Sequence, residues 1–79
     1  MRVQVRLFAY FREAAGVGET DLELAQGATV DDAWRALGER HARLAGHTPA
    51  PAVNRRVVPR GTVLSEGDEV AFLPPVSGG

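Results

Sequence analysis

The segment QGATVDDAWRALGERHARLAG, residues 26–46, carries apolar side chains at the spacing of one helix face. The residues on that face are Val30, Ala33, Trp34, Leu37 and Leu44. Thr29 is a suitable N-cap, acidic residues follow it in the first turn, and Gly46 ends the segment. Because this is the main helical segment, one helix of about fifteen residues has to cover whatever sheet the rest of the chain forms.

The N-terminal segment RVQVRLF, residues 2–8, alternates apolar and polar side chains as a half-buried strand does. One face of this strand carries Val3, Val5 and Leu7. Phe8 falls on the opposite face, among polar side chains. Residues 9–16, AYFREAAG, predict a short helical turn or a structured loop, because Gly16 and Gly18 interrupt the pattern.

Three further short strands are predicted from their apolar and β-branched residues and from the turn residues around them. They cover residues 20–25, 52–58 and 69–73. Leu22 and Leu24 point inward from the second strand, and Val70 and Phe72 share one face of the last. Leu73 and Ala71 therefore fall on the opposite face of the last strand.

The element order is strand, strand, helix, strand, strand. With one helix as the crossover, the first and last strands are expected to lie side by side as a parallel pair in the centre of the sheet. The predicted fold is therefore α+β: a β-grasp, ubiquitin-like domain in which one main helix covers a mixed sheet of four or five strands. An extended C-terminal tail follows it.

The composition excludes several classes of protein. The 79 residues suffice for one small domain, and the net charge of −1 argues against a nucleic-acid-binding surface. The chain has no Cys, so it has no disulfide, thiolate metal site or cysteine nucleophile. It shows neither a membrane-spanning apolar run nor a signal peptide, so a cytoplasmic location is expected. All nine basic side chains are Arg, which suits either codon bias or a carrier of an activated carboxyl group.

The chain ends in FLPPVSGG, and this ending is the strongest functional signal. Pro74 and Pro75 cannot donate to a sheet ladder and favour an extended, stiff backbone. We therefore expect residues 1–75 to form the β-grasp domain and residues 76–79 to form a flexible Gly-Gly tail. Gly78 has no side chain to clash with an enclosing site, so the carboxylate of the last residue is the predicted reactive group.

Three stretches resemble one family. GDEVAFLPPVSGG (67–79), VRLFAYFREAAG (5–16) and AVNRRVV (52–58) are similar to segments of the small subunits of molybdopterin synthase. The likeness extends over essentially the whole chain. The ending differs from that of the thiamine-pathway sulfur carrier, which is usually shorter and lacks the Pro-Pro pair, and from the Arg-containing tail of ubiquitin.

This resemblance implies a sulfur-carrier cycle. An adenylyltransferase of the ubiquitin-activating type would use ATP to activate Gly79, and a persulfide donor protein would convert it into a thiocarboxylate. The tail would then deliver sulfur to a cyclic pyranopterin in the large subunit's active site, in an expected heterotetramer. The chain would hold no permanent cofactor and would not be an enzyme on its own, because catalytic residues belong to the large subunit.

The resemblance also implies a partner surface. It comprises Phe8, Val57, Leu73, Pro74, Pro75, Val76 and Ser77. The alternation of side chains leaves open whether Val57 or Val58 faces outward. Arg55, Arg56 and Arg60 form a basic cluster, either solvated or complementary to an acidic partner. No metal site is expected, because the two His residues, 41 and 47, do not share a helix face and no Cys supports them.

Two other functions stay open. A related carrier could supply sulfur for tRNA thiolation, thiamine or cysteine, with the same tail chemistry and another acceptor. A ubiquitin-like modifier would instead join Gly79 to a target lysine. Adducts on lysines of other proteins would favour the modifier, whereas the Pro-Pro ending favours the molybdopterin pathway.

Overall fold

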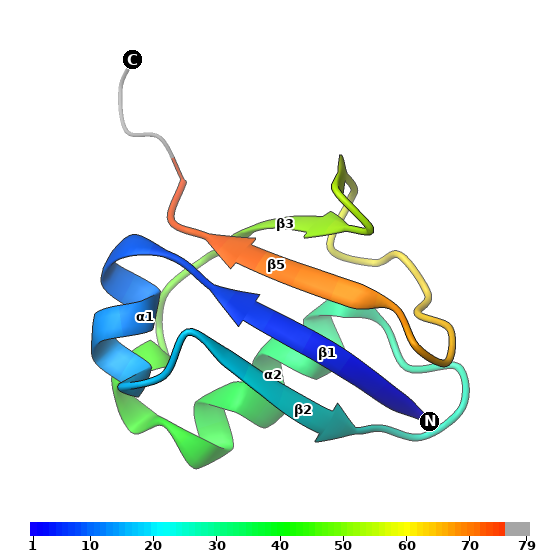
Figure 1. Ribbon diagram of the computed structural model, residues 1–79, viewed down its shortest axis with the longest axis horizontal. Coiled ribbons are helices and arrows are strands. Elements are labelled where there is room, and N and C mark those ends of the chain that lie inside the picture. The colour runs from blue at the N-terminus through cyan, green and yellow to red at the C-terminus, as the bar shows by residue number, and fades with distance from the viewer. Residues whose placement is uncertain (76–79) are drawn as a thin grey trace.

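The computed structural model describes residues 1–75. In chain order its elements are β1 (Arg2–Leu7), α1 (Ala9–Ala15), β2 (Glu19–Glu23), α2 (Val30–Arg40), the 3₁₀ helix η1 (Ala42–Leu44), β3 (Ala50–Val53), β4 (Arg56–Val57) and β5 (Glu69–Leu73). The strands form one mixed sheet in the order β2-β1-β5-β3-β4. In Figure 1, α2 lies behind this sheet and α1 lies at one end of it. This is the predicted α+β arrangement, with a five-stranded sheet.

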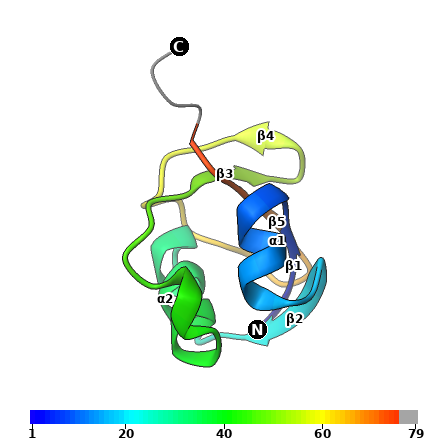
Figure 2. The ribbon, with the colours of Figure 1, turned by 90° about the vertical axis from the view of Figure 1, so that its left-hand side faces the viewer.

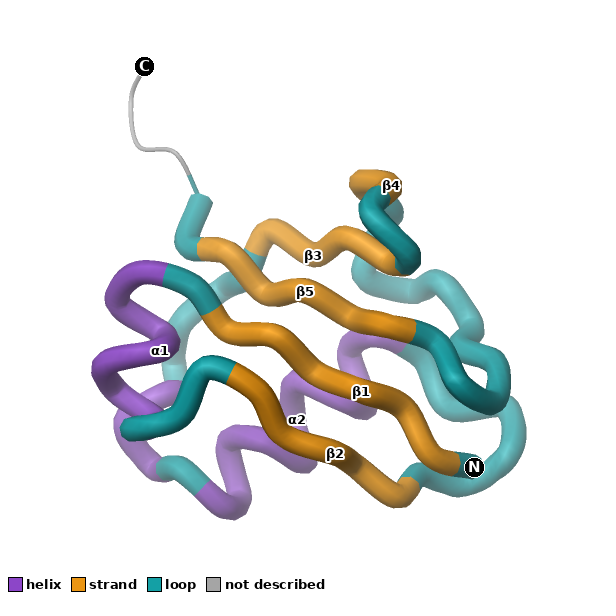
Figure 3. The backbone as a smooth tube through the Cα atoms, viewed as in Figure 1, coloured by secondary structure: helices purple, strands orange, loops and turns teal. Residues whose placement is uncertain are grey.

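The first and last strands are neighbours in the middle of the sheet, as predicted (Figure 3). They run parallel, with Val5 opposite Val70 and Leu7 opposite Phe72. All four side chains are buried. The core around them is completed by Val3, Phe11, Leu22, Val30, Ala33, Leu37, Leu44 and Leu64. The pairing therefore places the ends of β1 and β5 at the same edge of the domain.

Helix α2 begins where the sequence predicts. The Thr29 side chain accepts a hydrogen bond from the Asp32 backbone N–H at 3.2 Å, and the Thr29 backbone N–H donates to the Asp32 carboxylate at 2.9 Å. This reciprocal capping box satisfies two donors that a helix start would otherwise leave unpaired. The hydrogen bond from the Thr29 backbone N–H, and after it the interaction with the Thr29 side chain, lower the pKa of the Asp32 carboxyl group below its ordinary value.

The end of α2 differs from the prediction. The helix was expected to continue to Gly46, but it stops at Arg40, and His41 leaves the helical conformation with φ −129° and ψ 89°. The separate turn η1 then returns Leu44 to the core, where it is fully buried. The apolar spacing continues past the end of α2 because η1 buries Leu44 in the same core as the apolar face of α2. Periodicity alone therefore overestimated the length of the helix.

Residues 9–16, which the sequence left as a helical turn or a loop, form the seven-residue helix α1. Its buried residue Phe11 packs on Trp34 of α2, with ring centroids 4.8 Å apart, and Trp34 packs on Phe72 at 4.9 Å. Gly16 ends the helix in the left-handed conformation, φ 79°, and donates its N–H to the Arg12 carbonyl. Figure 2 shows α1 and α2 beside each other next to the sheet. Aromatic packing therefore joins the two helices to the last strand.

The predicted single strand over residues 52–58 is wrong. The chain folds there into a hairpin of β3 and β4, with Ala52 opposite Val57 and Val53 opposite Arg56. Both turn residues have positive φ, 49° at Asn54 and 70° at Arg55, as in a type I′ turn. The usual signal for this turn is Asn-Gly, so Asn-Arg between valines is easily mistaken for a continuous strand.

The Asn54 side chain joins this hairpin to the start of β5. Its amide donates to the Asp68 carboxylate at 3.0 Å, and its carbonyl accepts from the Glu69 backbone N–H at 3.0 Å. The Asp68 carboxylate also accepts from the Ser65 backbone N–H at 2.8 Å. Asn tolerates the left-handed region better than most residues, so it serves both the turn and this hydrogen-bond network.

We predict that Arg55→Gly raises the free energy of unfolding by roughly 0.5–1 kcal/mol. A left-handed backbone costs an L residue about 1–2 kcal/mol, and glycine removes this strain. Glycine also raises the conformational entropy of the unfolded chain, which offsets part of the stabilisation. Urea titration measures the change. Arg56→Gly is the matched control, because Arg56 is not among the residues with positive φ, and it should destabilise the domain. Equal effects of the two substitutions would contradict the role of the turn.

We also predict that Asp32→Ala destabilises the domain at pH 7 by more than Asp31→Ala, because only Asp32 belongs to the capping box. The folded-state pKa of Asp32 lies below its unfolded value, so its stabilising contribution is complete above about pH 4. That contribution is lost as the pH falls through the folded-state pKa. Urea titrations between pH 7 and pH 2 should therefore show the difference between the two variants shrinking. A difference that does not depend on pH would contradict an ionic contribution.

Candidate functional site: the open face at the end of the last strand

The candidate site lies where β1 and β5 end. β5 ends at Leu73, which pairs with Ala50 of β3, and β1 ends at Leu7, just before Phe8. Because the two strands are parallel with Leu7 opposite Phe72, Phe8 follows β1 at the level at which Leu73 ends β5. Pro74 is half-buried and Pro75 is exposed. The other predicted tail residues, Val76, Ser77, Gly78 and Gly79, lie outside the described residues.

The face of the sheet that the helices do not cover carries a run of apolar side chains, which we call the apolar strip. We define it as Phe8, Ala50, Ala52, Val57, Ala71 and Leu73. The register places Ala52 between Ala71 and Val57 across three strands. The strip is accessible, because Leu73 is 40% exposed and Val57 is 89% exposed. None of its members belongs to the buried core, so it is an apolar surface that folding leaves uncovered.

The hairpin also settles which valine faces outward. Val57 pairs with Ala52 and so shares the open face, whereas Val58 is half-buried and packs against the core. A two-residue turn reverses the chain between Val53 and Arg56, and this reversal sets which side chains of β4 lie on the open face. Alternation along the sequence could not supply this result, because it did not reveal the turn.

Phe8 is held at the junction of β1 and α1. The next residue, Ala9, has φ 51°, which is unusual for a residue with a side chain. The Phe8 carbonyl accepts from the Phe11 backbone N–H at 3.1 Å and from the Arg12 N–H at 3.4 Å. The Arg6 guanidinium carbon lies 5.6 Å from the centre of the Phe8 ring, a cation–π distance. Phe8 is therefore the member of the apolar strip that borders a more polar region.

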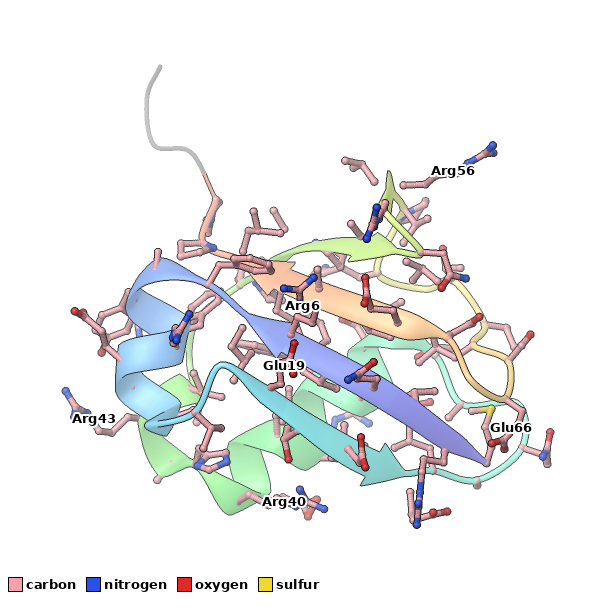
Figure 4. The ribbon with its side chains drawn as sticks, in the orientation of Figure 1. Arg6, Glu19, Arg40, Arg43, Arg56 and Glu66 are labelled. Carbon is pink, nitrogen blue, oxygen red and sulfur yellow. The ribbon has the colours of Figure 1, made fainter. Side chains whose placement is uncertain are left out.

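That polar region contains a hollow that the sequence analysis did not identify. It is lined by Arg6, Leu7, Phe8, Arg12, Gly18 and Glu19, and its volume is about 320 Å³. In Figure 4, Arg6 and Glu19 lie together on the open face of the sheet, and their closest nitrogen and oxygen are 3.5 Å apart. The sequence offers only a weak signal for this site, which is the pair Arg6 and Arg12, six positions apart. The two side chains line one hollow because α1 folds back beside the end of β1.

The remaining charged and aromatic residues lie in several separate places within residues 1–75. No group of three or more His, Cys, Asp or Glu side chains in this part of the chain could hold a metal ion. The His47 ring packs near Tyr10, with ring centroids 5.1 Å apart. The backbone carbonyl of His47 accepts a hydrogen bond from the Trp34 indole N–H. Arg60 lies 3.9 Å from Asp31, beside the start of α2. The other two residues of the predicted basic cluster, Arg55 and Arg56, belong to the hairpin of β3 and β4. Among the described residues, no helix has the length and apolar character that crossing a bilayer requires.

Curated relatives align with this chain from end to end. The molybdopterin synthase sulfur carrier subunit of Mycobacterium tuberculosis is 37% identical over 82 residues and aligns over 100% of this chain and 99% of its own length. Its namesake from Chlamydomonas reinhardtii is 40% identical over 83 residues, with all of both chains covered. Small archaeal modifier protein 3 from Haloferax volcanii is 36% identical over 92 residues, also with both covered completely.

Solved structures show the same fold. SAMP1 from Haloferax volcanii superposes with a TM-score of 0.88 at 30% identity, and 100% of both chains is covered. A chain in the complex of subunits 1 and 2 of the molybdopterin-converting factor from Helicobacter pylori superposes with a TM-score of 0.66 at 28% identity, again over 100% of both chains. The profile of the ThiS family matches residues 5–79, nearly the whole sequence, and this chain belongs to the ThiS family.

Proposed function

We propose that this chain is the sulfur-carrier small subunit of molybdopterin synthase. Residues 1–75 act as the β-grasp domain, and residues 76–79 act as the tail whose terminal group carries the sulfur. The observation that carries the proposal is the end-to-end match to relatives bearing the name of this subunit. The position of the last strand supports it, because β5 ends beside the exposed apolar strip with only six residues of the sequence left.

The chemistry takes place at the carboxylate of Gly79. One carboxylate oxygen attacks the α-phosphorus of ATP on an adenylyltransferase, and pyrophosphate leaves. The terminal sulfur of a donor protein's persulfide then attacks the acyl carbon, and AMP leaves. A second thiol reduces the resulting acyl disulfide, which releases the thiocarboxylate and oxidises the donor to a disulfide. The thiocarboxylate sulfur then bonds to a cyclic pyranopterin held by the large subunit, and water cleaves the acyl–sulfur bond, which leaves the sulfur on the pterin and restores the carboxylate of Gly79.

In this cycle the β-grasp domain binds the partner proteins and directs the tail into their active sites. The apolar strip docks on the large subunit and on the adenylyltransferase in turn. Pro74 and Pro75 limit the conformations of the tail root, which reduces the entropy lost when the tail enters a partner's active site. The catalytic acids, bases and ATP-binding groups belong to those partners. The complex of subunits 1 and 2 from Helicobacter pylori is an assembly of this kind.

The absence of lysine suits a carrier of an activated acyl group. All nine basic side chains are Arg. A guanidinium stays protonated at neutral pH and is a poor nucleophile, whereas a deprotonated lysine amine attacks acyl adenylates readily. The surface of the domain therefore keeps its positive charges without offering side-chain amines that would consume the activated tail.

A second candidate function is protein modification. The likeness to small archaeal modifier protein 3 and to SAMP1 favours it, because these relatives share the fold and align over the full chain. The same activated Gly79 would then form an isopeptide bond with a lysine of a target protein. A carrier for another sulfur pathway remains the third candidate, with the same tail chemistry and a different acceptor enzyme.

We predict that adding one alanine after Gly79 abolishes sulfur transfer and leaves the domain folded. The wild-type chain, incubated with its host's cytoplasmic extract, ATP and cysteine, should gain the mass of one oxygen-to-sulfur exchange. Fragmentation should locate this change at Gly79, which distinguishes it from oxidation of Met1. The extended chain should show no such change. Thiocarboxylate formation on an untrimmed extended chain would refute the tail chemistry, and lysine adducts of wild type would favour the modifier.

We predict that Val57→Asp and Leu73→Asp each weaken binding to the large subunit of the host's molybdopterin synthase about tenfold or more, because each buries a charge in an apolar contact. Titration calorimetry measures the affinity. Both side chains are exposed, so the free energy of unfolding should change by less than about 0.5 kcal/mol. Val63→Asp is the matched control, because Val63 is 60% exposed and lies beside the start of α2. An equal loss of affinity in the control would contradict docking through the strip.

A further inference from the structure

The hollow beside Phe8 is lined by charged side chains and adjoins the apolar strip, so it is a candidate for a second contact with the docking partner. Its floor is fixed by a backbone hydrogen bond in which the Leu7 N–H donates to the Gly18 carbonyl at 2.9 Å. Its walls come from the end of β1, from α1 and from the first residue of β2. Because Phe8 belongs both to the hollow and to the apolar strip, the two surfaces are continuous.

The two arginines of the hollow differ in what they already contact. Arg6 lies 3.5 Å from the Glu19 carboxylate and stacks over the Phe8 ring. Arg12 is exposed, and no carboxylate among residues 1–75 lies within ion-pair distance of its guanidinium. The lining of the hollow therefore carries two positive charges and one negative charge, and among residues 1–75 only Arg6 of the two arginines has a carboxylate partner.

Gly18 leaves room for the Arg12 guanidinium in the position that it occupies. A Cβ atom built on Gly18 would come within 3.1 Å of both Cζ and Nε of Arg12 and within 3.4 Å of Nη1. The guanidinium thus lies directly over the backbone of Gly18, in space that any other residue would fill. Gly18 has no positive φ, so this close approach, and not backbone conformation, is what glycine provides at this position.

We propose that the hollow is a binding site for a carboxylate side chain, Asp or Glu, of the protein that docks on the apolar strip, with Arg12 as its main ligand. This inference rests on the proposed function, in which that protein is the large subunit. A guanidinium offers two parallel N–H donors that match the two oxygens of a carboxylate. Docking on the neighbouring strip would remove water from the pair and strengthen it, at the polar rim that borders an apolar contact.

Glu19 of the hollow itself explains why the site takes one acidic side chain and not a polyanion. Its carboxylate pairs with Arg6, so within the described part of the chain Arg12 is the lining arginine that has no ion-pair partner. The whole chain has a net charge of −1, which opposes the binding of nucleic acid. A single acidic side chain, oriented by contact with the strip, fits both the charge and the size of the hollow.

The first experiment tests the site without any partner. Sodium acetate is the carboxylate probe, added to the ¹⁵N-labelled full chain, with sodium chloride at equal ionic strength as the reference. Saturable NMR shifts are expected at the Gly18 amide and the Arg12 side chain. The shift of the Gly18 amide should vanish in Arg12→Gln and persist in Arg43→Gln, because Arg43 lies outside the lining of the hollow and points away from the domain in Figure 4. Shifts that are absent in wild type, or unchanged in Arg12→Gln, overturn the site.

The second experiment tests its role by calorimetry with the host's large subunit. Arg12→Glu should weaken binding about tenfold or more, whereas Arg43→Glu, with the same change in net charge, should weaken it no more than about threefold. Gly18→Ala keeps the charge but displaces the guanidinium, so it should weaken binding by an intermediate factor. An Asp or Glu of the large subunit that restores binding to Arg12→Glu when changed to Arg identifies the partner group.

The outcomes separate this inference from the function on which it rests. Equal effects of Arg12→Glu and Arg43→Glu on a complex that forms normally overturn the role of Arg12. If wild type does not bind the large subunit at all, the proposed function fails, and the acetate titration alone decides whether the carboxylate site exists. Circular dichroism of Arg12→Glu and Gly18→Ala checks that each variant is folded, and Arg12→Lys should recover part of the lost affinity.

Discussion

The rest of the structure depends on the parallel pairing of β1 with β5. Val5 lies opposite Val70 and Leu7 opposite Phe72, so segments more than sixty residues apart in the chain form the centre of one sheet and of the core. A parallel pair requires a crossover on one face of the sheet, and that requirement places α2 there. The opposite face stays uncovered, and both strands end at the same edge.

This geometry accounts for the apolar strip. Residues alternate along a strand, so burying Val70 and Phe72 turns Ala71 and Leu73 toward the open face. The hairpin extends that face as far as Val57. The sheet thus exposes an apolar contact surface beside the end of its last strand. The hollow beside Phe8, lined by Arg6, Arg12 and Glu19, borders this surface.

The sequence predicted the regular parts of the fold because each leaves a local pattern. Alternation located β1 and β5, and an N-cap followed by acidic residues located the start of α2. The errors occurred where a pattern continued across a break. Leu44 keeps the apolar spacing of α2 although it belongs to η1, and Asn54 interrupts a β-branched segment without the glycine that usually marks a tight hairpin.

The sequence by itself determined the α+β class, the family and most of the core of β1, α2 and β5, because apolar periodicity and the terminal motif are local properties of the chain; the burial of Phe11 and Leu64 was not predicted. Only the tertiary structure decided that Val57 faces outward, that six apolar side chains from β3, β4, β5 and the end of β1 form one strip, and that Arg6, Arg12 and Glu19 line one hollow. These residues lie apart in the sequence and share no motif. They meet only because strand register and the turn after β1 bring them together, and both are set by long-range packing.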